Sequence, residues 1–262
     1  MLLVLDVGNT NIVVGVFDGK ELISSYRMGT SINATSDEYS ATIAQLLNMD
    51  DIKLSMIEDV IISSVVPEVM HSLENFALKH IGKAPMVIGP GIKTGINIKY
   101  ENPTQVGADR IVNAVAGYEK YGGPLIIIDF GTATTFCFIN EKGEYHGGLI
   151  APGVKISSEA LFQRASKLHK VELVKPKNVV GKNTTVAMQA GIYYGYIGMV
   201  DNIVRCIKEE MNTPHAKVIS TGGLASLFIA DTQNVEIIDK NLTLDGLRLI
   251  YEKNKQGEYE NR

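Results

Sequence analysis

The sequence lacks most of the features that mark specialised classes of protein. Its 262 residues contain no tryptophan and two cysteines, and the formal net charge is −4. A slightly acidic chain lacks the basic character of a nucleic-acid-binding domain, so no nucleic-acid partner is expected. No run of about 18 apolar residues is long enough to span a membrane, and the first apolar run is interrupted at Asp6 without a basic leader. We therefore expect a cytoplasmic protein with no membrane partner.

The cysteines and histidines show no metal-binding pattern. Cys137 and Cys206 are far apart, form no C-x-x-C motif and lie in apolar surroundings, which favours two buried thiols over a disulfide, a zinc site or a nucleophile. The five histidines have no ligand-like pair spacing. We expect no transition-metal site.

The strongest pattern present lies at the start of the chain. Residues 2–5 are an apolar run that predicts a buried strand, and residues 12–17 predict its hairpin partner. Asp6 and Gly8 lie between these runs, followed by small polar side chains. A glycine lets a ligand approach the backbone, small polar groups can face phosphate oxygens, and a carboxylate can hold Mg²⁺ directly or through water. A simple hairpin turn would use the same residue types, so the motif alone leaves both interpretations open.

The same pattern recurs 123 residues later, from Asp6 to Asp129, about half the chain away. Residues 126–143 again contain an apolar strand, Asp129, Gly131, small polar residues, a second apolar strand and a turn that ends at a glycine. Two copies of one hairpin, each opening its own half, predict two similar domains that face each other across a cleft.

The remaining pattern predicts an α/β architecture with helices on both sides of a mixed sheet. Residues 21–28 predict a third strand, Thr35 and Glu38 fit a capping box that begins a helix, and Pro67 follows the strand predicted at 60–66 and opens another helix. Residues 89–94 resemble a P-loop but have the wrong spacing, which indicates an ordinary loop.

Residues 100–110 form an irregular loop that enters a helix whose first turn carries Asp109 and Arg110. An aspartate there often only complements the helix dipole. This helix, however, lies between the two hairpins in sequence, where a phosphate acceptor is expected. A carboxylate beside a guanidinium suits an acceptor with both a hydroxyl and a carboxylate.

Each of three later segments leaves two interpretations open. The basic residues of 164–183 indicate a solvated face, or a surface that attracts anionic substrates. A long helix is predicted from Val186 to about Met211, and its Gly191, Gly195 and Gly198 indicate close packing within the subunit or against a partner's helix. Residues 218–225 predict a strand, a glycine turn and a helix, which suit an adenosine-contacting loop or a turn without a ligand.

Four segments together resemble one family: residues 6–11, Gly107-Ala108-Asp109-Arg110, residues 129–134, and the glycines of 147–153. They resemble type III pantothenate kinase, within the superfamily of sugar kinases, actin and heat-shock chaperone ATPases. The match runs from residue 2 to about 230 without a departure in these motifs. It implies a duplicated actin-like fold, with ribonuclease H-like halves at residues 1–117 and 118–262 and a cleft between them.

The resemblance also implies an activity. It is ATP-dependent phosphorylation of pantothenate at its terminal hydroxyl, the first step toward coenzyme A, by a homodimer that uses Mg²⁺ and a monovalent cation, K⁺ or NH₄⁺. Asp109 would be the catalytic base, and Asp129 would hold the monovalent cation. ATP would be bound by Asp6, Val7, Gly8, Asn9, Thr10, Asn11, Ile12, Val13 and Thr132. Pantothenate would be held by Tyr100, Gly107, Ala108, Asp109, Arg110 and Thr184, with Thr184 acting in its own or the partner's site.

Two other classes fit the duplicated hairpins. One is an actin- or chaperone-like ATPase, and the other is a catalytically silent nucleotide-binding regulator. The chain shows no client domain or filament insertion, which disfavours the first class, and the presence of Asp6, Asp109 and Asp129 disfavours the second.

Overall fold

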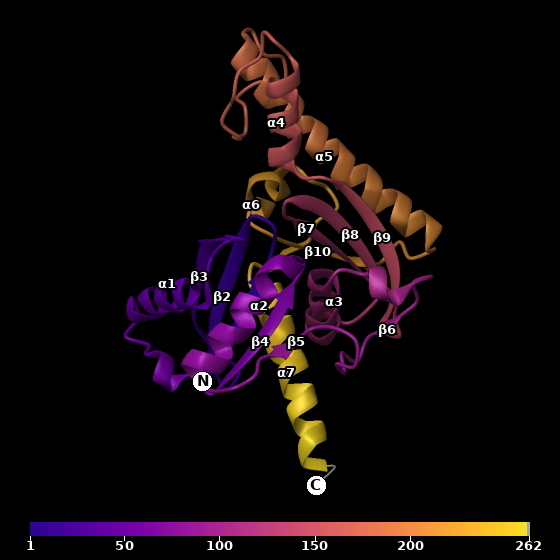
Figure 1. Cartoon of the computed structure of the whole chain (residues 1–262). Coiled ribbons are helices and arrows are strands. Elements are labelled where there is room, and N and C mark those ends of the chain that lie inside the picture. Colours follow the sequence, from indigo (N-terminus) through magenta and orange to yellow (C-terminus); the bar gives the residue numbers. More distant parts are fainter. Residues whose placement is uncertain (261–262) are drawn as a thin grey trace. The chain divides into compact units, whose positions relative to one another are not determined.

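The computed structural model describes residues 1–260, which fall into two compact units (Figure 1). Unit 1 contains Met1–Ile96, Asn102–Ala116 and the segment that begins at Leu242. Unit 2 contains Asn97–Glu101 and Gly117–Asn241. The division of the sequence into duplicated halves at residues 117 and 118 stays a prediction.

Unit 1 is built on a five-stranded sheet with the order β3-β2-β1-β4-β5. The first three strands form an antiparallel meander, and β4 and β5 continue the sheet in parallel. The strands are β1 (Leu2–Val7), β2 (Asn11–Asp18), β3 (Glu21–Gly29), β4 (Asp59–Ser64) and β5 (Met86–Val87).

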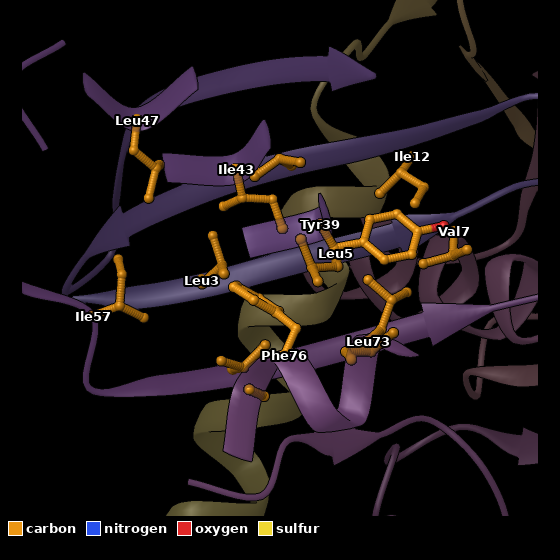
Figure 2. Packing of buried hydrophobic residues seen from close by; sticks show 14 of the residues in the cluster. Leu3, Leu5, Val7, Ile12, Tyr39, Ile43, Leu47, Ile57, Leu73 and Phe76 are labelled. Atoms are coloured by element: carbon orange, nitrogen blue, oxygen red, sulfur yellow. The ribbon is translucent and has the colours of Figure 1, made fainter. Parts of the chain in front are cut away.

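Two helices cover one face of this sheet. Helix α1 (Ser36–Asn48) begins with the predicted capping box, in which the Glu38 amide donates to Thr35 Oγ1 at 3.3 Å and the Thr35 amide donates to Glu38 Oε2 at 2.8 Å. Helix α2 (Pro67–Phe76) begins at the predicted proline and continues as a π-helical turn, Ala77–Ile81. The core between these helices and the sheet is shown in Figure 2; it includes Leu3, Leu5, Val7, Ile43, Leu47, Leu73 and Phe76.

Helices α3 (Ala108–Tyr121) and α7 (Leu242–Glu260) supply the core on the other face. Val112 of α3 and Leu244 of α7 are buried there with Val4 and Ile61 of the sheet. The two helices approach closely at Gly246, where an added Cβ would lie 2.2 Å from the carbonyl oxygen of Val112. Chain segments far apart in sequence therefore complete one core.

Unit 2 repeats this plan with a six-stranded sheet of order β11-β10-β7-β8-β9-β6. Strands β7, β8 and β9 form an antiparallel meander and β10 is parallel to β7, as β4 is to β1. The strands are β6 (Asn97–Ile98), β7 (Leu125–Phe130), β8 (Ala133–Ile139), β9 (Glu144–Pro152), β10 (Lys217–Thr221) and β11 (Ile237–Ile238). The helices are α4 (Val154–Arg164), α5 (Thr184–Glu210) and α6 (Ala225–Phe228). Short 3₁₀ helices lie at Leu54–Met56 and Pro103–Gln105 in unit 1 and at Ile229–Asp231 in unit 2.

The predicted α/β class is confirmed, and one local expectation is wrong. Cys137 is buried as expected, but Cys206 is exposed. Buried positions on α5 include Val200, Val204 and Ile207, and Cys206 lies on a different side of the helix from this apolar stripe. Over residues 1–260, none of the helices combines the length and the hydropathy that a membrane-spanning segment requires.

Candidate phosphate and acceptor sites

The first carboxylate turn, in unit 1, is fixed by hydrogen bonds from neighbouring backbone and from β3. The Gly8 amide donates to the Asn11 carbonyl at 3.0 Å, and Thr30 Oγ1 at the end of β3 donates to the Gly8 carbonyl at 2.6 Å. The Thr30 amide donates to the Thr10 carbonyl at 3.1 Å. Because the turn is held from both sides, its polar side chains project from a rigid support.

The residues predicted to bind ATP in this turn differ in how far their side chains are exposed. Asn9 and Thr10 are exposed, and Asp6, Asn11 and Val13 are partly exposed. The side chains of Val7 and Ile12 are buried in the core of unit 1, so these two residues can offer a ligand only their backbone groups.

The second carboxylate turn, in unit 2, has the same place in its sheet. Asp129 precedes the last residue of β7, as Asp6 precedes the last residue of β1, and both are partly exposed. The Gly131 amide donates to the Ala133 carbonyl at 3.1 Å, which leaves Thr132 exposed at the tip. The structure therefore gives the two carboxylates the same place in their sheets, although the second turn is one residue shorter, since Val7 pairs with Ile12 but Phe130 pairs with Thr134.

Two other loops of unit 2 pack directly against this second turn. An added Cβ at Gly153 would lie 2.0 Å from the Thr132 carbonyl oxygen. An added Cβ at Gly222, whose φ is +92°, would lie 2.6 Å from Asp129 Oδ1. The predicted adenosine loop and the 147–153 segment thus converge on the Asp129 turn, because their glycines allow a backbone approach that no other residue would.

The candidate acceptor group lies at the start of α3 in unit 1. The Gly107 carbonyl accepts the Arg110 amide at 3.1 Å and so begins the helix, and the Asp109 carboxylate accepts the same amide at 2.8 Å. Asp109 and Arg110 are both partly exposed, and the Arg110 guanidinium donates to the Gln105 carbonyl at 3.4 Å. An added Cβ at Gly107 would lie 2.5 Å from Asp109 Oδ1, so a larger residue here would displace this carboxylate oxygen.

Tyr100 and Thr184, the other two residues predicted to hold the acceptor, belong to unit 2. Tyr100 lies beside Gly147, where the nearest ring carbon would be 3.1 Å from an added Cβ. Thr184 is the exposed first residue of α5, and the preceding Asn183 caps this helix by accepting the Val186 amide at 2.9 Å.

An open cavity of about 820 Å³ lies in unit 2 beside Thr184. Its walls come from α4, the segment before α5, and the face of α5 that carries Gly191 and Gly195. These two glycines and Gly198 are exposed, and an added Cβ at any of them would have no atom within 4 Å. Packing inside the subunit therefore does not account for the glycines.

Tyr196 connects the cavity to the second carboxylate turn. Its ring lines the cavity, its hydroxyl donates to the Pro152 carbonyl, and the same hydroxyl lies 3.2 Å from Thr134 Oγ1 at the start of β8. Burial raises the pKa of Tyr196, so the hydroxyl stays protonated as a donor. Sequence analysis missed this residue, because its partners are 44 and 62 positions away.

Comparison with solved structures identifies the fold. The chain is similar to a Campylobacter jejuni protein described as a Baf-family transcriptional activator, with a TM-score of 0.60 and 20% identity over 97% of this chain and 99% of that one. It is also similar to component A of (R)-2-hydroxyglutaryl-CoA dehydratase from Acidaminococcus fermentans (TM-score 0.55, 14% identity, 95% and 96% covered). A third similar structure is the ROK hexokinase from Thermus thermophilus (TM-score 0.50, 14% identity, 97% and 99% covered). At these identities the similarity shows a shared fold, the two-domain fold of actin-like sugar kinases.

The family is established by the sequence itself. The model of the type III pantothenate kinase family matches residues 2–206. The chain therefore belongs to the type III pantothenate kinase family, as its motifs predict, and is a kinase at the level of that family. The matched range contains both carboxylate turns, the Asp109–Arg110 pair and Thr184.

Proposed function

We propose that this protein phosphorylates pantothenate to 4′-phosphopantothenate with ATP, the first step of coenzyme A biosynthesis. The observation that carries the proposal is that one family match, over residues 2–206, includes two carboxylate turns at the same place in their sheets and the Asp109–Arg110 pair. Phosphoryl transfer depends mainly on positioning and charge stabilisation, and rigid turns at strand ends are suited to both.

The first turn is the proposed site for magnesium–ATP. Mg²⁺ is bound through one or two carboxylates, substrate phosphates and water, and it neutralises phosphate charge. The partly exposed Asp6 carboxylate beside the exposed Asn9 and Thr10 fits such an ion, since all of them offer oxygen ligands or phosphate donors. Asn11 supplies a further polar side chain here, and Thr132 of the second turn, in unit 2, is a separately proposed phosphate ligand. Val7, Gly8, Ile12 and Val13 contribute through the backbone that the Gly8 and Thr30 hydrogen bonds hold in place.

The start of α3 is the proposed acceptor site. The pantothenate hydroxyl oxygen attacks the γ-phosphorus, Asp109 accepts the hydroxyl proton, and the bond from the γ-phosphorus to the β,γ-bridging oxygen breaks to release ADP. The Arg110 guanidinium pairs with the pantothenate carboxylate, since the two parallel N–H groups of a guanidinium favour bidentate contacts with carboxylates. Gly107 and Ala108 offer backbone groups at the helix start. Tyr100 and Thr184, which belong to unit 2, are proposed as further pantothenate ligands.

Asp129 is the proposed ligand of a monovalent cation, K⁺ or NH₄⁺. Its carboxylate is partly exposed, and the Gly222 turn packs directly against it. This packing supports a compact cation site at the second turn. A cation there would offset phosphate charge. Activity that is equal in sodium and in potassium would leave Asp129 as a second phosphate-turn carboxylate only.

The working form is proposed to be a homodimer built on α5. Each glycine in a helix interior costs about 1 kcal/mol relative to alanine, and the exposed faces of Gly191, Gly195 and Gly198 have no compensating contact with the described part of the chain. A partner's helix packed on this face would explain them. Thr184 lies at the start of the same helix, so pairing would also fix its position in an acceptor site.

The test is ADP release by the purified protein with and without pantothenate, in buffers that contain potassium or sodium. The proposal predicts turnover that depends on pantothenate and is faster in potassium. Turnover without an acceptor would instead support an actin- or chaperone-like ATPase. Nucleotide binding without any turnover would support a silent regulator.

A further inference from the structure

Ser63, near the end of β4, has a buried hydroxyl group without a hydrogen-bond partner. The residue is 0% exposed, and its Oγ is one of three buried side-chain polar atoms without a partner in the described part of the chain. Leaving a buried polar group unpaired costs roughly 1–3 kcal/mol, and such groups call for an explanation. An alanine would fill the same place without this cost.

The strand register places Ser63 beside Asp6. Strands β1 and β4 are parallel neighbours in which Asp6 pairs with Ser63 and Val4 pairs with Ile61. Paired residues on neighbouring strands point to the same face of a sheet. Val4 and Ile61 are buried on the face covered by α3 and α7, so Ser63 and Asp6 lie on that face at the carboxyl ends of the two strands.

Unit 2 has the same arrangement around its own carboxylate. Asp129 of β7 pairs with Thr221 of the parallel strand β10, and Thr221 is 2% exposed. Each half therefore places a buried hydroxyl residue next to its motif carboxylate in the neighbouring parallel strand. The recurrence in two halves of different sequence argues against an accidental serine at position 63.

We propose that Ser63 is a positioning residue for Asp6. Its hydroxyl donates a hydrogen bond to the Asp6 carboxylate when magnesium–nucleotide is bound, and so fixes the orientation of the carboxylate at the phosphates. A serine hydroxyl can rotate to donate without backbone movement, and a carboxylate has enough lone pairs to accept this bond while also facing a hydrated ion. The inference rests on the proposed function, because it assigns Ser63 to the nucleotide site that the proposed kinase reaction uses.

The test is a double-mutant cycle between Ser63→Ala and Asp6→Ala, which removes the acceptor carboxylate altogether. Affinity for a non-hydrolysable ATP analogue with Mg²⁺ is measured by calorimetry on the full chain, and thermal unfolding is measured without nucleotide. Ser63→Ala should weaken analogue binding about 10- to 150-fold, as expected for one hydrogen bond to a charged group, and should leave the nucleotide-free unfolding temperature unchanged or higher. In the Asp6→Ala background, Ser63→Ala should cause no further loss, because the hydroxyl no longer has a carboxylate to donate to.

A matched control is Ser40→Ala, which removes the hydroxyl of another buried serine of unit 1, on α1. It should leave analogue affinity unchanged. The assignment is overturned if Ser63→Ala leaves affinity unchanged, if its loss is equally large in both backgrounds, or if nucleotide-free stability falls with no change in affinity. A wild-type protein that binds the analogue with this coupling but does not phosphorylate pantothenate would refute the proposed function and leave the Ser63 assignment standing. A wild-type protein that does not bind the analogue would refute both.

Discussion

Among single residues, Asp109 has the most specific proposed chemical role. Its carboxylate accepts the Arg110 amide at 2.8 Å and is partly exposed, so one oxygen is oriented while the group remains accessible. A general base must reach the proton that it removes, and contributions of 10²- to 10⁴-fold are typical of such residues. The hydrogen bond at the start of α3 would survive replacement by an amide, since an amide oxygen can accept it as well.

We predict that Asp109→Asn lowers the kcat for pantothenate phosphorylation about 10²- to 10⁴-fold and leaves the unfolding temperature close to that of the wild type. Steady-state kinetics and thermal melting measure both. The control Glu119→Gln removes an exposed carboxylate from the same helix and should change kcat less than about twofold, in line with ordinary surface substitutions. Near-wild-type turnover by Asp109→Asn would remove Asp109 from the mechanism.

Asp231 gives a prediction about pH. The Lys175 ammonium at 2.6 Å and the Tyr193 hydroxyl at 2.6 Å hold the pKa of this carboxyl below its usual value. A lowered folded-state pKa gives stability that is present above the unfolded pKa, about 3.9, and is lost as the pH falls through the folded value. Asp231→Asn should therefore melt at a lower temperature than the wild type at pH 7, and the difference should shrink below about pH 4. A difference that is constant from pH 7 to pH 3 would show that the ionised carboxylate contributes nothing.

Individual elements were predictable where the signal is local. The capping box at Thr35 and Glu38 and the proline at the start of α2 act within one helical turn, and both are confirmed. The glycine-flanked hairpins were predictable because their polar turns interrupt strongly apolar strands. The 89–94 segment is an irregular loop, as its spacing indicates.

Elements that depend on distant contacts were harder to predict. Helix α4 ends at Arg164, because Ala165 has an extended backbone, although no glycine or proline in the sequence marks this end. Strand β6 has two residues and exists through pairing with Glu144 and Tyr145, 47 positions away along the chain. Such short strands leave no periodicity in the sequence.

The α5 glycine face allows a test at the scale of one element. Gly195 is exposed and has no atom within 4 Å of an added Cβ, so a larger side chain fits within the subunit. We predict that Gly195→Leu gives a folded monomer, because leucine prevents the close approach of a second helix. This monomer should bind ATP with wild-type affinity and pantothenate more weakly. Light scattering and separate titrations of the two ligands measure these effects.

Gly195→Ala is the matched control. Alanine adds one methyl group and favours the helix by about 1 kcal/mol. If the position faces only solvent and no partner's helix, the unfolding temperature should therefore rise. A Gly195→Leu protein that stays dimeric would show that the dimer does not use this face. A fully active monomer would show that the dimer contributes nothing to the acceptor site.

At the scale of the whole molecule, late segments of the chain pack on a sheet whose strands lie much earlier in the sequence. Periodicity predicts a helix near residues 244–253, but it cannot say which sheet that helix covers. The structure shows α7 in unit 1, where Leu244, Leu247 and Ile250 join the core with Val112 of α3. The pairing of Ser63 with Asp6 was equally hidden, since the two residues are neighbours only through the β1–β4 register.

Gly246 tests this long-range packing. An added Cβ would lie 2.2 Å from the Val112 carbonyl oxygen, so Gly246→Ala must push α7 away from α3. We predict a loss of about 1–3 kcal/mol in the free energy of unfolding, which is typical of overpacked cores. The control is Gly29→Ala at the exposed end of β3, where no atom lies within 4 Å of an added Cβ and little change is expected. Equal stabilities measured by urea denaturation would show that α7 does not pack closely here.

The central claim concerns the acceptor, because the shared fold also occurs in a hexokinase. The most direct measurement is a competition in which the protein, magnesium–ATP and potassium are mixed with equal concentrations of pantothenate, glucose and N-acetylmannosamine, and the products are identified by mass spectrometry. The proposed function predicts 4′-phosphopantothenate as the phosphorylated product, with its formation lost in Asp109→Asn. A phosphorylated sugar in place of phosphopantothenate would contradict the proposal.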